Sequence, residues 1–267
     1  MKALSKIYTA LVFVFLYAPI VVLILFSFNS TNSTGVFTGF STYWYKELFS
    51  NSEAIGALKN TLILATTSAL ISSVIGTAAA TGIVKFRNRA IKGSVMSLTN
   101  IPMMNPDIVT GISMMLLFVF IGRLLGLSSN LSFWTLLIAH VTFCIPYVIL
   151  NVLPKFSQMD VHLPEAAMDL GCTPLRSFFK VELPAIFPGV LSGFIMAFTL
   201  SLDDFIISHF TTSGFETLPI FIYSMTKKKV KPDMYALSTL IFITILVLLI
   251  LSNIITAKGE KRNKHSK

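Results

Sequence analysis

The chain has 267 residues, of which 54% are hydrophobic and 12% are charged, and its mean hydropathy is +0.77. Soluble globular proteins carry roughly 25% charged residues, so this composition excludes an ordinary soluble domain and predicts a chain with much of its surface in lipid. Two cysteines exclude a disulfide framework, and the net charge of +9 comes mainly from short basic connectors between apolar runs rather than from a nucleic-acid-binding patch.

Six runs along the chain are uncharged or nearly so, and each is long enough for the roughly 20 residues that cross a bilayer. We expect spans at about residues 7–28, 60–84, 94–122, 131–153, 184–207 and 234–257. The first run is longer than the apolar core of a secretory signal and lacks a small-residue cleavage site, so we expect an uncleaved anchor. The sequence therefore predicts an all-α integral membrane protein with residues 1–267 as one transmembrane domain.

Basic residues in the connectors predict the orientation of these spans. With the N-terminus in the cytoplasm, 14 lysines and arginines fall inside and 7 fall outside, and both termini are cytoplasmic. The one discordant feature is an outer cluster of Lys227, Lys228, Lys229 and Lys231.

The connector at residues 154–183 carries the most specific pattern, within the text LPEAAMDLGCTPLRSFFKVELPAIFPG. Its fixed positions are Glu165, Ala166, Ala167, Gly171, Leu183 and Pro184. This pattern resembles the EAA loop of ABC importer permeases, and the resemblance implies the type I permease fold. In that family the loop docks into a groove on a separate ATPase subunit and passes on its movement.

The local chemistry of this connector agrees with the resemblance. Small apolar residues of one helix face precede Gly171, which permits a sharp reversal before a second short helix at Pro174 to Glu182. We therefore expect a helix, a turn and a second helix along the membrane surface. The alternative is an amphipathic loop lying on lipid.

Three further segments resemble the spermidine and putrescine importers within that superfamily. They are MNPDIVTGIS at residues 104–113, FWTLLIAHVTFCIPYV at 133–148 and FTLSLDDFIISHF at 198–210. The resemblance covers nearly the whole chain, and its acid-containing segments point to the polyamine branch.

Three acids in the apolar runs are candidates for a substrate pathway, because a carboxylate in lipid costs several kcal/mol unless it is paired or faces a polar cavity. These are Asp107, Asp203 and Asp204. Asp107 follows Pro102 and Pro106 and precedes Gly111, a combination that breaks or restarts a helix and exposes backbone groups to a cavity. Counted along straight helices, Asp107 and Asp203 lie about 20 and 22 Å from the cytoplasmic starts of their spans, at similar depth. Asp107 could instead serve only as a helix-start acid, and the adjacent pair could be helix-end acids in water.

Adjacent helical residues point about 100° apart, so one acid of the pair faces a narrow pathway squarely. We choose Asp203, because Thr199 lies one turn earlier on the same face. A linear polyamine suits separated carboxylates with aromatic walls, which attract cations. Candidate wall residues are Phe198, Phe205, Trp134 and Tyr147.

The remaining sequence patterns give weaker indications of function. His140 and Cys144 have a spacing that could bind a metal, but no third ligand is evident, so we expect packing and no metal site. No GxxxxGK[ST] motif is present, so we expect no cofactor in this chain and ATP in partner subunits. The small residues Ser72, Ser73, Gly76 and Ala80 suit close helix packing, inside the subunit or against a partner.

These observations predict a non-enzymatic permease subunit of a bacterial ABC importer for polyamines, in the inner membrane. The expected partners are a homologous permease subunit, two ATPase subunits and an extracytoplasmic substrate-binding protein. The runner-up is the same machine for another cationic or small solute. An intramembrane enzyme would need a nucleophile and base or a metal site, and a channel or secondary transporter would not need the EAA loop.

Overall fold

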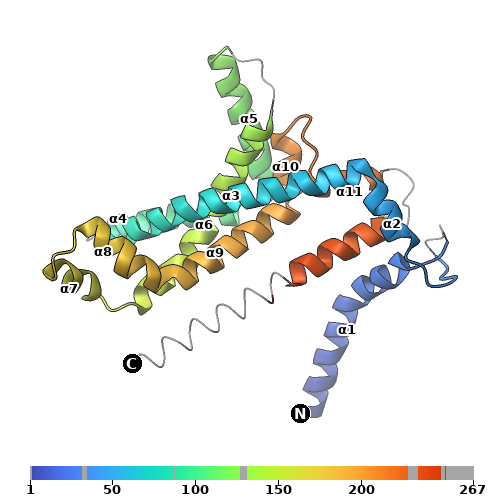
Figure 1. The fold of residues 1–267 in the computed structure, drawn as a ribbon, viewed down its shortest axis with the longest axis horizontal. Helices are drawn as coiled ribbons and strands as arrows, with labels where there is room; N and C mark the ends of the chain where they lie inside the picture. Colours follow the sequence, from blue (N-terminus) through green and yellow to red (C-terminus); the bar gives the residue numbers. More distant parts are fainter. Residues whose placement is uncertain are drawn as a thin grey trace. The chain divides into compact units, whose positions relative to one another are not determined.

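A computed structural model of the chain describes residues 2–31, 35–86, 88–126, 131–227, 234–247 and 250 (Figure 1). Within these residues the structure is helical, and the only β pairing is an isolated bridge between Asn29 and Phe40. Five helices are long and apolar enough to cross a membrane, at residues 5–27, 52–85, 107–124, 133–158 and 174–203. They overlap the first five expected spans.

The sixth expected span is described only in part. Residues 234–247 form a shorter apolar helix, and the rest of the expected span, apart from Ile250, lies outside the described residues. The prediction of six spans therefore stays a prediction, as does the single domain over 1–267.

The chain divides into two compact units, of which the first comprises residues 1–59 and 220–247. It contains α1 (Lys2–Ser27), α2 (Tyr43–Ser50), the beginning of α3 (Ser52–Lys85), most of α11 (Leu218–Thr226) and the helix at 234–247. The buried Asn29 organises the segment after α1. Its side chain bonds to the backbone of Val36 and Thr38, and its carbonyl accepts from the Trp44 indole at 2.7 Å.

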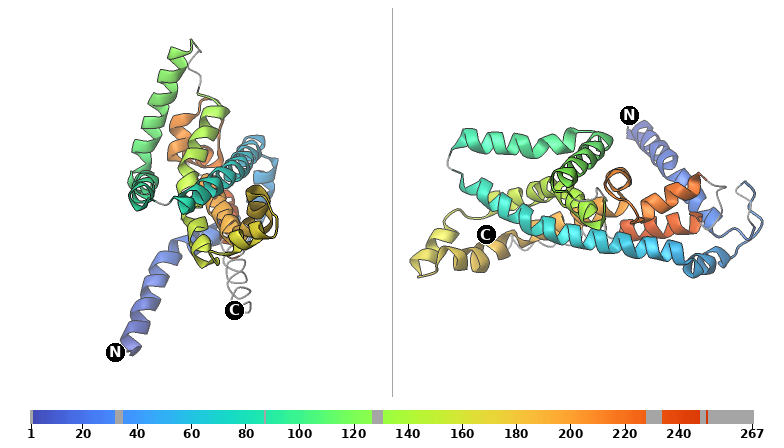
Figure 2. Two further views of the ribbon diagram at one scale, coloured as in Figure 1. Left: turned by 90° about the vertical axis from the view of Figure 1, so that its left-hand side faces the viewer. Right: turned by 90° about the horizontal axis from the view of Figure 1, so that it is seen from above.

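The second unit comprises residues 60–219 and 248–267 and holds the helical core. Besides most of α3, its elements are α4 (Arg89–Met104), α5 (Asp107–Leu124), α6 (Phe133–Gln158), α7 (Leu163–Asp169), α8 (Pro174–Ser177), η1 (Phe178–Glu182), α9 (Leu183–Asp203) and α10 (Ile206–Thr211). Helix α6 packs along α9, and α5 packs along α10 (Figure 2).

Close packing in this unit depends on glycines that face α6. A Cβ on Gly76 of α3 would lie 2.7 Å from the Cβ of Val148, and one on Gly193 of α9 would lie 3.2 Å from the Cα of the same valine. Small residues let helix backbones approach where lipid supplies no hydrophobic driving force. Gly76 therefore packs inside the subunit, which is one of the two uses expected for the small residues of the second span.

The third expected span, 94–122, is divided in the structure into α4 and α5. Asn105 and Pro106 adopt extended backbone, with ψ angles of 141° and 136°, and α5 starts afresh at Asp107. Proline lacks an N–H and disfavours helical geometry in the residue before it. A depth counted along one straight helix from Ser94 therefore does not apply to Asp107.

The fifth expected span, 184–207, is also interrupted. Helix α9 ends at Asp203, Asp204 has ψ 122°, and α10 begins at Ile206. At its other end the span is longer than expected, because α8, the π-helical turn η1 and α9 follow one another without a break from Pro174 to Asp203. The expected second loop helix is thus the first part of this span.

Candidate functional site

Two of the predicted pathway acids lie at helix interruptions and are exposed. Asp203 is the last residue of α9, and Asp107 is the first residue of α5. Helix α5, which begins at Asp107, packs along α10, which begins three residues after Asp203, and a Cβ on Gly111 of α5 would lie 3.1 Å from the Phe210 ring of α10. The fold thus places two acids that are 96 residues apart in sequence on neighbouring segments.

The third acid, Asp204, is turned into the protein, and its side chain is 8% exposed. Its carboxylate accepts hydrogen bonds from the backbone N–H groups of Ile207 and Ser208, at 3.3 and 2.8 Å, and from the Ser208 hydroxyl at 2.9 Å. These bonds satisfy the free N–H groups at the start of α10. The two adjacent acids therefore have different environments, one exposed and one buried.

His140 of α6 completes the buried side of this site, and its ring is fully buried. Nδ1 lies 2.7 Å from the Ser201 hydroxyl of α9, and Nε2 lies 3.0 Å from the Ser208 hydroxyl of α10 and 3.5 Å from Asp204 Oδ2. Both ring nitrogens are occupied by these groups. Among the residues described, no three His, Cys, Asp or Glu side chains are grouped to hold a metal ion.

Sequence reasoning missed Ser201 and Ser208 as partners of His140. Their only signal was position, since they flank the acid pair on either side, seven residues apart. Pairing them with a histidine more than 60 residues earlier requires the fold.

The predicted wall residues separate into two groups. Tyr147 and Phe198 are half-buried at the edge of the core, with Tyr147 edge-to-face on Phe143 at 5.5 Å and Phe198 stacked on Phe194 at 6.3 Å. Phe205 lies in the interruption itself and stacks on His209 at 5.4 Å. All three lie on the elements that carry or adjoin the acids.

Trp134 and Thr199 are placed differently. Trp134 is 68% exposed near the start of α6, about 9 Å along the helix from His140, and its ring contacts Phe133. The described contacts do not bring it to the acids. Thr199 is half-buried one turn before Asp203, and its hydroxyl donates to the carbonyl of Ile195 within α9.

A pocket of about 290 Å³ opens beside the interruption between α4 and α5. Its polar lining comes from Asn105, Thr110, Ser113 and Thr142, and its apolar lining includes Pro102 and Phe143. The hydroxyl of Thr142 and the amide of Asn105 give a polar neighbourhood to the helix interruption, which directly precedes Asp107 in the sequence.

The EAA segment has the turn that its glycine predicts. Helix α7 ends in a Schellman motif: the Gly171 N–H donates to the Met168 carbonyl at 2.9 Å, and the Cys172 N–H donates to the Ala167 carbonyl at 3.1 Å. Gly171 has a φ of +88°, in the left-handed region that favours glycine. Ala167 is buried under this turn, whereas Glu165 and Ala166 are exposed.

The second half of the segment is fixed to the first and to α3. The Ser177 hydroxyl donates to the Pro164 carbonyl of α7 at 3.3 Å, and the buried Glu182 accepts from Lys85 at the end of α3 at 3.4 Å. Leu183 and Pro184 form the first turn of α9. Large apolar side chains remain exposed on the segment, namely Val161, Leu170, Leu175 and Phe179.

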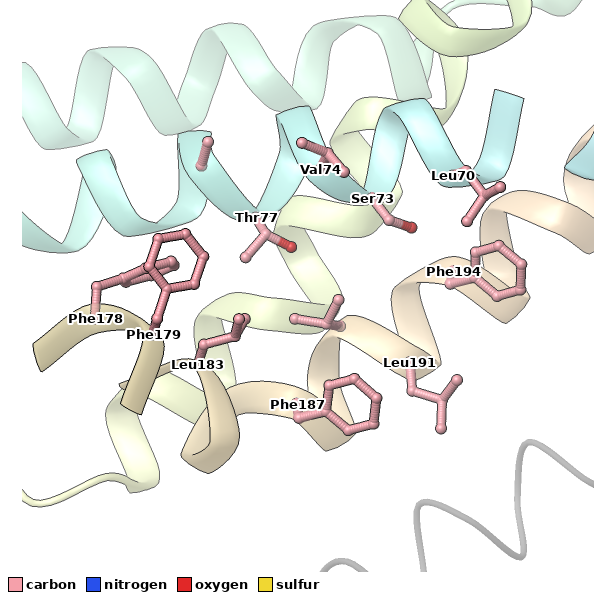
Figure 3. Close-up of a pocket in the computed structure, with 12 residues that line it drawn as sticks. Leu70, Ser73, Val74, Thr77, Phe178, Phe179, Leu183, Phe187, Leu191 and Phe194 are labelled. Atoms are coloured by element: carbon pink, nitrogen blue, oxygen red, sulfur yellow. The ribbon is translucent and has the colours of Figure 1, made fainter. Parts of the chain in front are cut away.

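An apolar groove of about 590 Å³ runs between α3 and the η1–α9 segment (Figure 3). Four phenylalanines line it, Phe178, Phe179, Phe187 and Phe194. Ser73 and Thr77 of α3 also line it, and their hydroxyl oxygens are buried without a hydrogen-bond partner among the described residues. The small residues of the second span therefore serve two faces, with Gly76 toward α6 and these two toward the groove.

Comparison with known proteins identifies the family. Residues 72–265 match the family of inner membrane components of binding-protein-dependent transport systems. The chain belongs to this family. The match includes the EAA segment, His140 and all three acids.

Similar curated proteins cover nearly the whole chain. The putrescine transport system permease protein PotI of Escherichia coli (strain K12) is 39% identical over 252 residues, which are 94% of this chain and 89% of that protein. The spermidine/putrescine transport system permease protein PotC of Haemophilus influenzae is 37% identical over 258 residues, 96% of this chain and 98% of that protein.

Solved structures share the fold at low sequence identity. A bacterial ABC transporter that imports the acidic polysaccharide alginate aligns with a TM-score of 0.71 at 15% identity, over 97% of this chain and 95% of that chain. An amino acid ABC transporter aligns with a TM-score of 0.58 at 19% identity, over 80% and 98%. The fold is therefore that of ABC importer permeases, and the chain is a multi-pass membrane protein.

Proposed function

We propose that this chain is the transmembrane subunit of an ABC importer that carries polyamines, putrescine or spermidine, into the cell. The observation that carries the proposal is the position of two exposed acids, Asp107 and Asp203, at two helix interruptions whose following helices, α5 and α10, pack together. The identity of 37–39% to polyamine permeases over nearly the whole chain supports the same substrate class.

The chemistry of the site suits a linear cation. A diamine or triamine carries ammonium groups separated by short apolar stretches, so separated carboxylates together with aromatic rings can bind it in steps. Asp107 and Asp203 supply the charges, and the half-buried Tyr147 of α6 and Phe198 of α9 are the proposed rings. Asp204 contributes differently, because its oxygens already accept bonds from α10.

ATP hydrolysis belongs to separate subunits in this proposal. The exposed apolar side chains of the EAA segment, Leu170 and Leu175 above all, offer a docking surface for one of the importer's two ATPase subunits. An extracytoplasmic substrate-binding protein delivers the cation, a partnership supported by the family's description and by an alginate transporter structure solved with its periplasmic protein. The chain itself needs no cofactor or metal.

A second, homologous permease subunit completes the pathway, and the apolar groove between α3 and α9 is its proposed contact. The groove exposes large apolar side chains on α3, with Leu70 53% and Val74 72% exposed, and small residues beside them let the backbone of a neighbouring helix approach closely. Disulfide cross-linking between Val74→Cys and single cysteines along the partner's helices tests this contact. Absence of any cross-link, with lipid retained in the groove, would contradict it.

The distribution of basic residues supports an orientation with both termini in the cytoplasm. The helix that ends at Asp203 then starts from the cytoplasmic side, where the EAA segment faces the ATPase subunits.

Neutralising the acids one at a time tests the substrate pathway. Asp107→Asn and Asp203→Asn keep shape and remove charge, so each should lower spermidine or putrescine uptake about tenfold if the carboxylate stabilises the passing ammonium by about 1.4 kcal/mol. Uptake and membrane abundance are measured together in cells that depend on this importer.

The helix-start role of Asp107 predicts a different result, because asparagine also caps helices well and would leave transport near normal. Near-normal uptake in both variants at normal abundance would remove the basis for a cationic substrate bound by these acids.

A further inference from the structure

Five buried side chains from four helices form one hydrogen-bonded chain at the interruption between α9 and α10. Ser68 of α3 donates to the Ser201 hydroxyl at 2.9 Å, and Ser201 contacts His140 Nδ1 at 2.7 Å. On the other side of the ring, Nε2 contacts the Ser208 hydroxyl at 3.0 Å, and Ser208 donates to Asp204 at 2.9 Å.

The direction of each hydrogen bond in this series can be deduced, because each hydroxyl has only one hydrogen to donate. Ser208 has one hydroxyl hydrogen and gives it to the Asp204 carboxylate, so its oxygen must accept a hydrogen from His140 Nε2. A neutral ring then has no hydrogen on Nδ1, which accepts from Ser201. Ser201 in turn accepts from Ser68. With a neutral His140 that carries its hydrogen on Nε2, every side chain from Ser68 to an ionised Asp204 has a hydrogen-bond partner.

The hydrogen-bonded chain of side chains crosses the interruption between α9 and α10. Ser201 belongs to α9, before the break, and Ser208 and the cap made by Asp204 belong to α10, after it. His140 lies on α6 and holds both sides through the two nitrogens of a single rigid ring. A fully satisfied buried polar network of this kind fixes one geometry, because any shift leaves a buried group unpaired.

We propose that His140 is the positioning residue for the pathway acid Asp203, an inference that rests on the proposed function. By fixing where α9 stops and α10 starts, the ring determines the direction in which the last residue of α9 presents its carboxylate. Asp204 belongs to this positioning network, and Asp203 contacts the substrate.

Two variants interrupt the network in different ways. His140→Phe keeps a ring of similar size and leaves the Ser201 and Ser208 hydroxyls without their partner. Ser208→Ala removes the link between the ring and Asp204 with little change of volume, so it tests the proposal even if His140→Phe does not fold. We expect each to lower uptake about tenfold at normal membrane abundance, with His140→Gln, which retains a donor and an acceptor, recovering part of the loss.

The matched control is Thr211→Val, which also removes one buried hydroxyl from α10. The Thr211 hydroxyl donates to the Ile207 carbonyl of its own helix at 2.7 Å and has no described bond to the network. Uptake by this variant should stay near normal. A loss equal to that of Ser208→Ala would mean that any buried hydroxyl of α10 matters, and would overturn the proposal.

A double-mutant cycle separates positioning from general support of the fold. If His140 acts through Asp203, the double variant of Ser208→Ala with Asp203→Asn loses about tenfold, no more than Asp203→Asn alone. Independent effects would multiply to a loss of about a hundredfold and overturn the proposal while the proposed function stands. Normal uptake in Asp203→Asn alone would instead contradict the proposed substrate contact, and the positioning role with it.

Discussion

Glu182 is a buried carboxylate whose described ionic partner is the half-exposed ammonium of Lys85. Removing the lysine leaves the buried charge without compensation, so Lys85→Met should destabilise the subunit by about 1–3 kcal/mol, and adding Glu182→Gln should restore much of the loss. Thermal unfolding of the purified protein in detergent measures both variants. Lys180→Met, at an exposed position of the same segment, is the control. A double variant as unstable as Lys85→Met would contradict this account.

The adjacent acids Asp203 and Asp204 show what the sequence can predict about single residues and what it cannot. The angle between neighbouring helical residues predicts that Asp203 and Asp204 face different ways. The two acids do differ, one exposed and the other buried, but the reason is that the helix ends at Asp203 and Asp204 has extended backbone. Which acid turns inward depends on His140 and Ser208, and their contact spans 68 positions of the chain. Local spacing alone does not reveal such a contact.

At the scale of single helices, one prediction concerns the Gly171 turn that ends α7. Gly171→Val should abolish coupled transport while the protein still inserts, because valine rarely adopts the positive φ of this position and the Schellman turn would open. A Cβ at this position meets no atom within 4 Å, so backbone conformation and not crowding is at stake.

The matched variant is Gly171→Asn, since asparagine tolerates the left-handed region better than other side chains. It should retain substantially more substrate-stimulated ATP hydrolysis in the assembled complex than Gly171→Val. Equal activity of the valine variant and the unmodified protein would refute the role of the turn.

Among the elements, hydropathy predicted where five apolar helices lie, and Pro102 and Pro106 ahead of Asp107 predicted that a helix breaks or restarts there. The structure confirms this restart, because α4 ends at Met104 and α5 begins at Asp107. The end of α9 at Asp203 had no proline to mark it. It coincides with the network around His140, a tertiary contact that overrides local helix propensity.

For the whole molecule, the testable property is orientation. In a background without Cys144 and Cys172, Ser213→Cys should react with an impermeant thiol reagent added outside intact cells, and Lys92→Cys should react only after the membrane is opened. Both positions are exposed, so reactivity depends on the side of the membrane. The reverse pattern would mean that the lysines at 227–231 are the inside signal.

The continuous helix from Pro174 to Asp203 has a mechanical consequence. It joins the EAA turn at one end to an acid at the other, through 30 residues that include the π-helical turn η1 and Pro188. Such a turn and such a proline are the places where a helix bends, so a displacement at the EAA turn reaches Asp203 through these two points. The Glu182–Lys85 ion pair ties η1 to α3, so this contact determines how much of the displacement is taken up before it reaches α9.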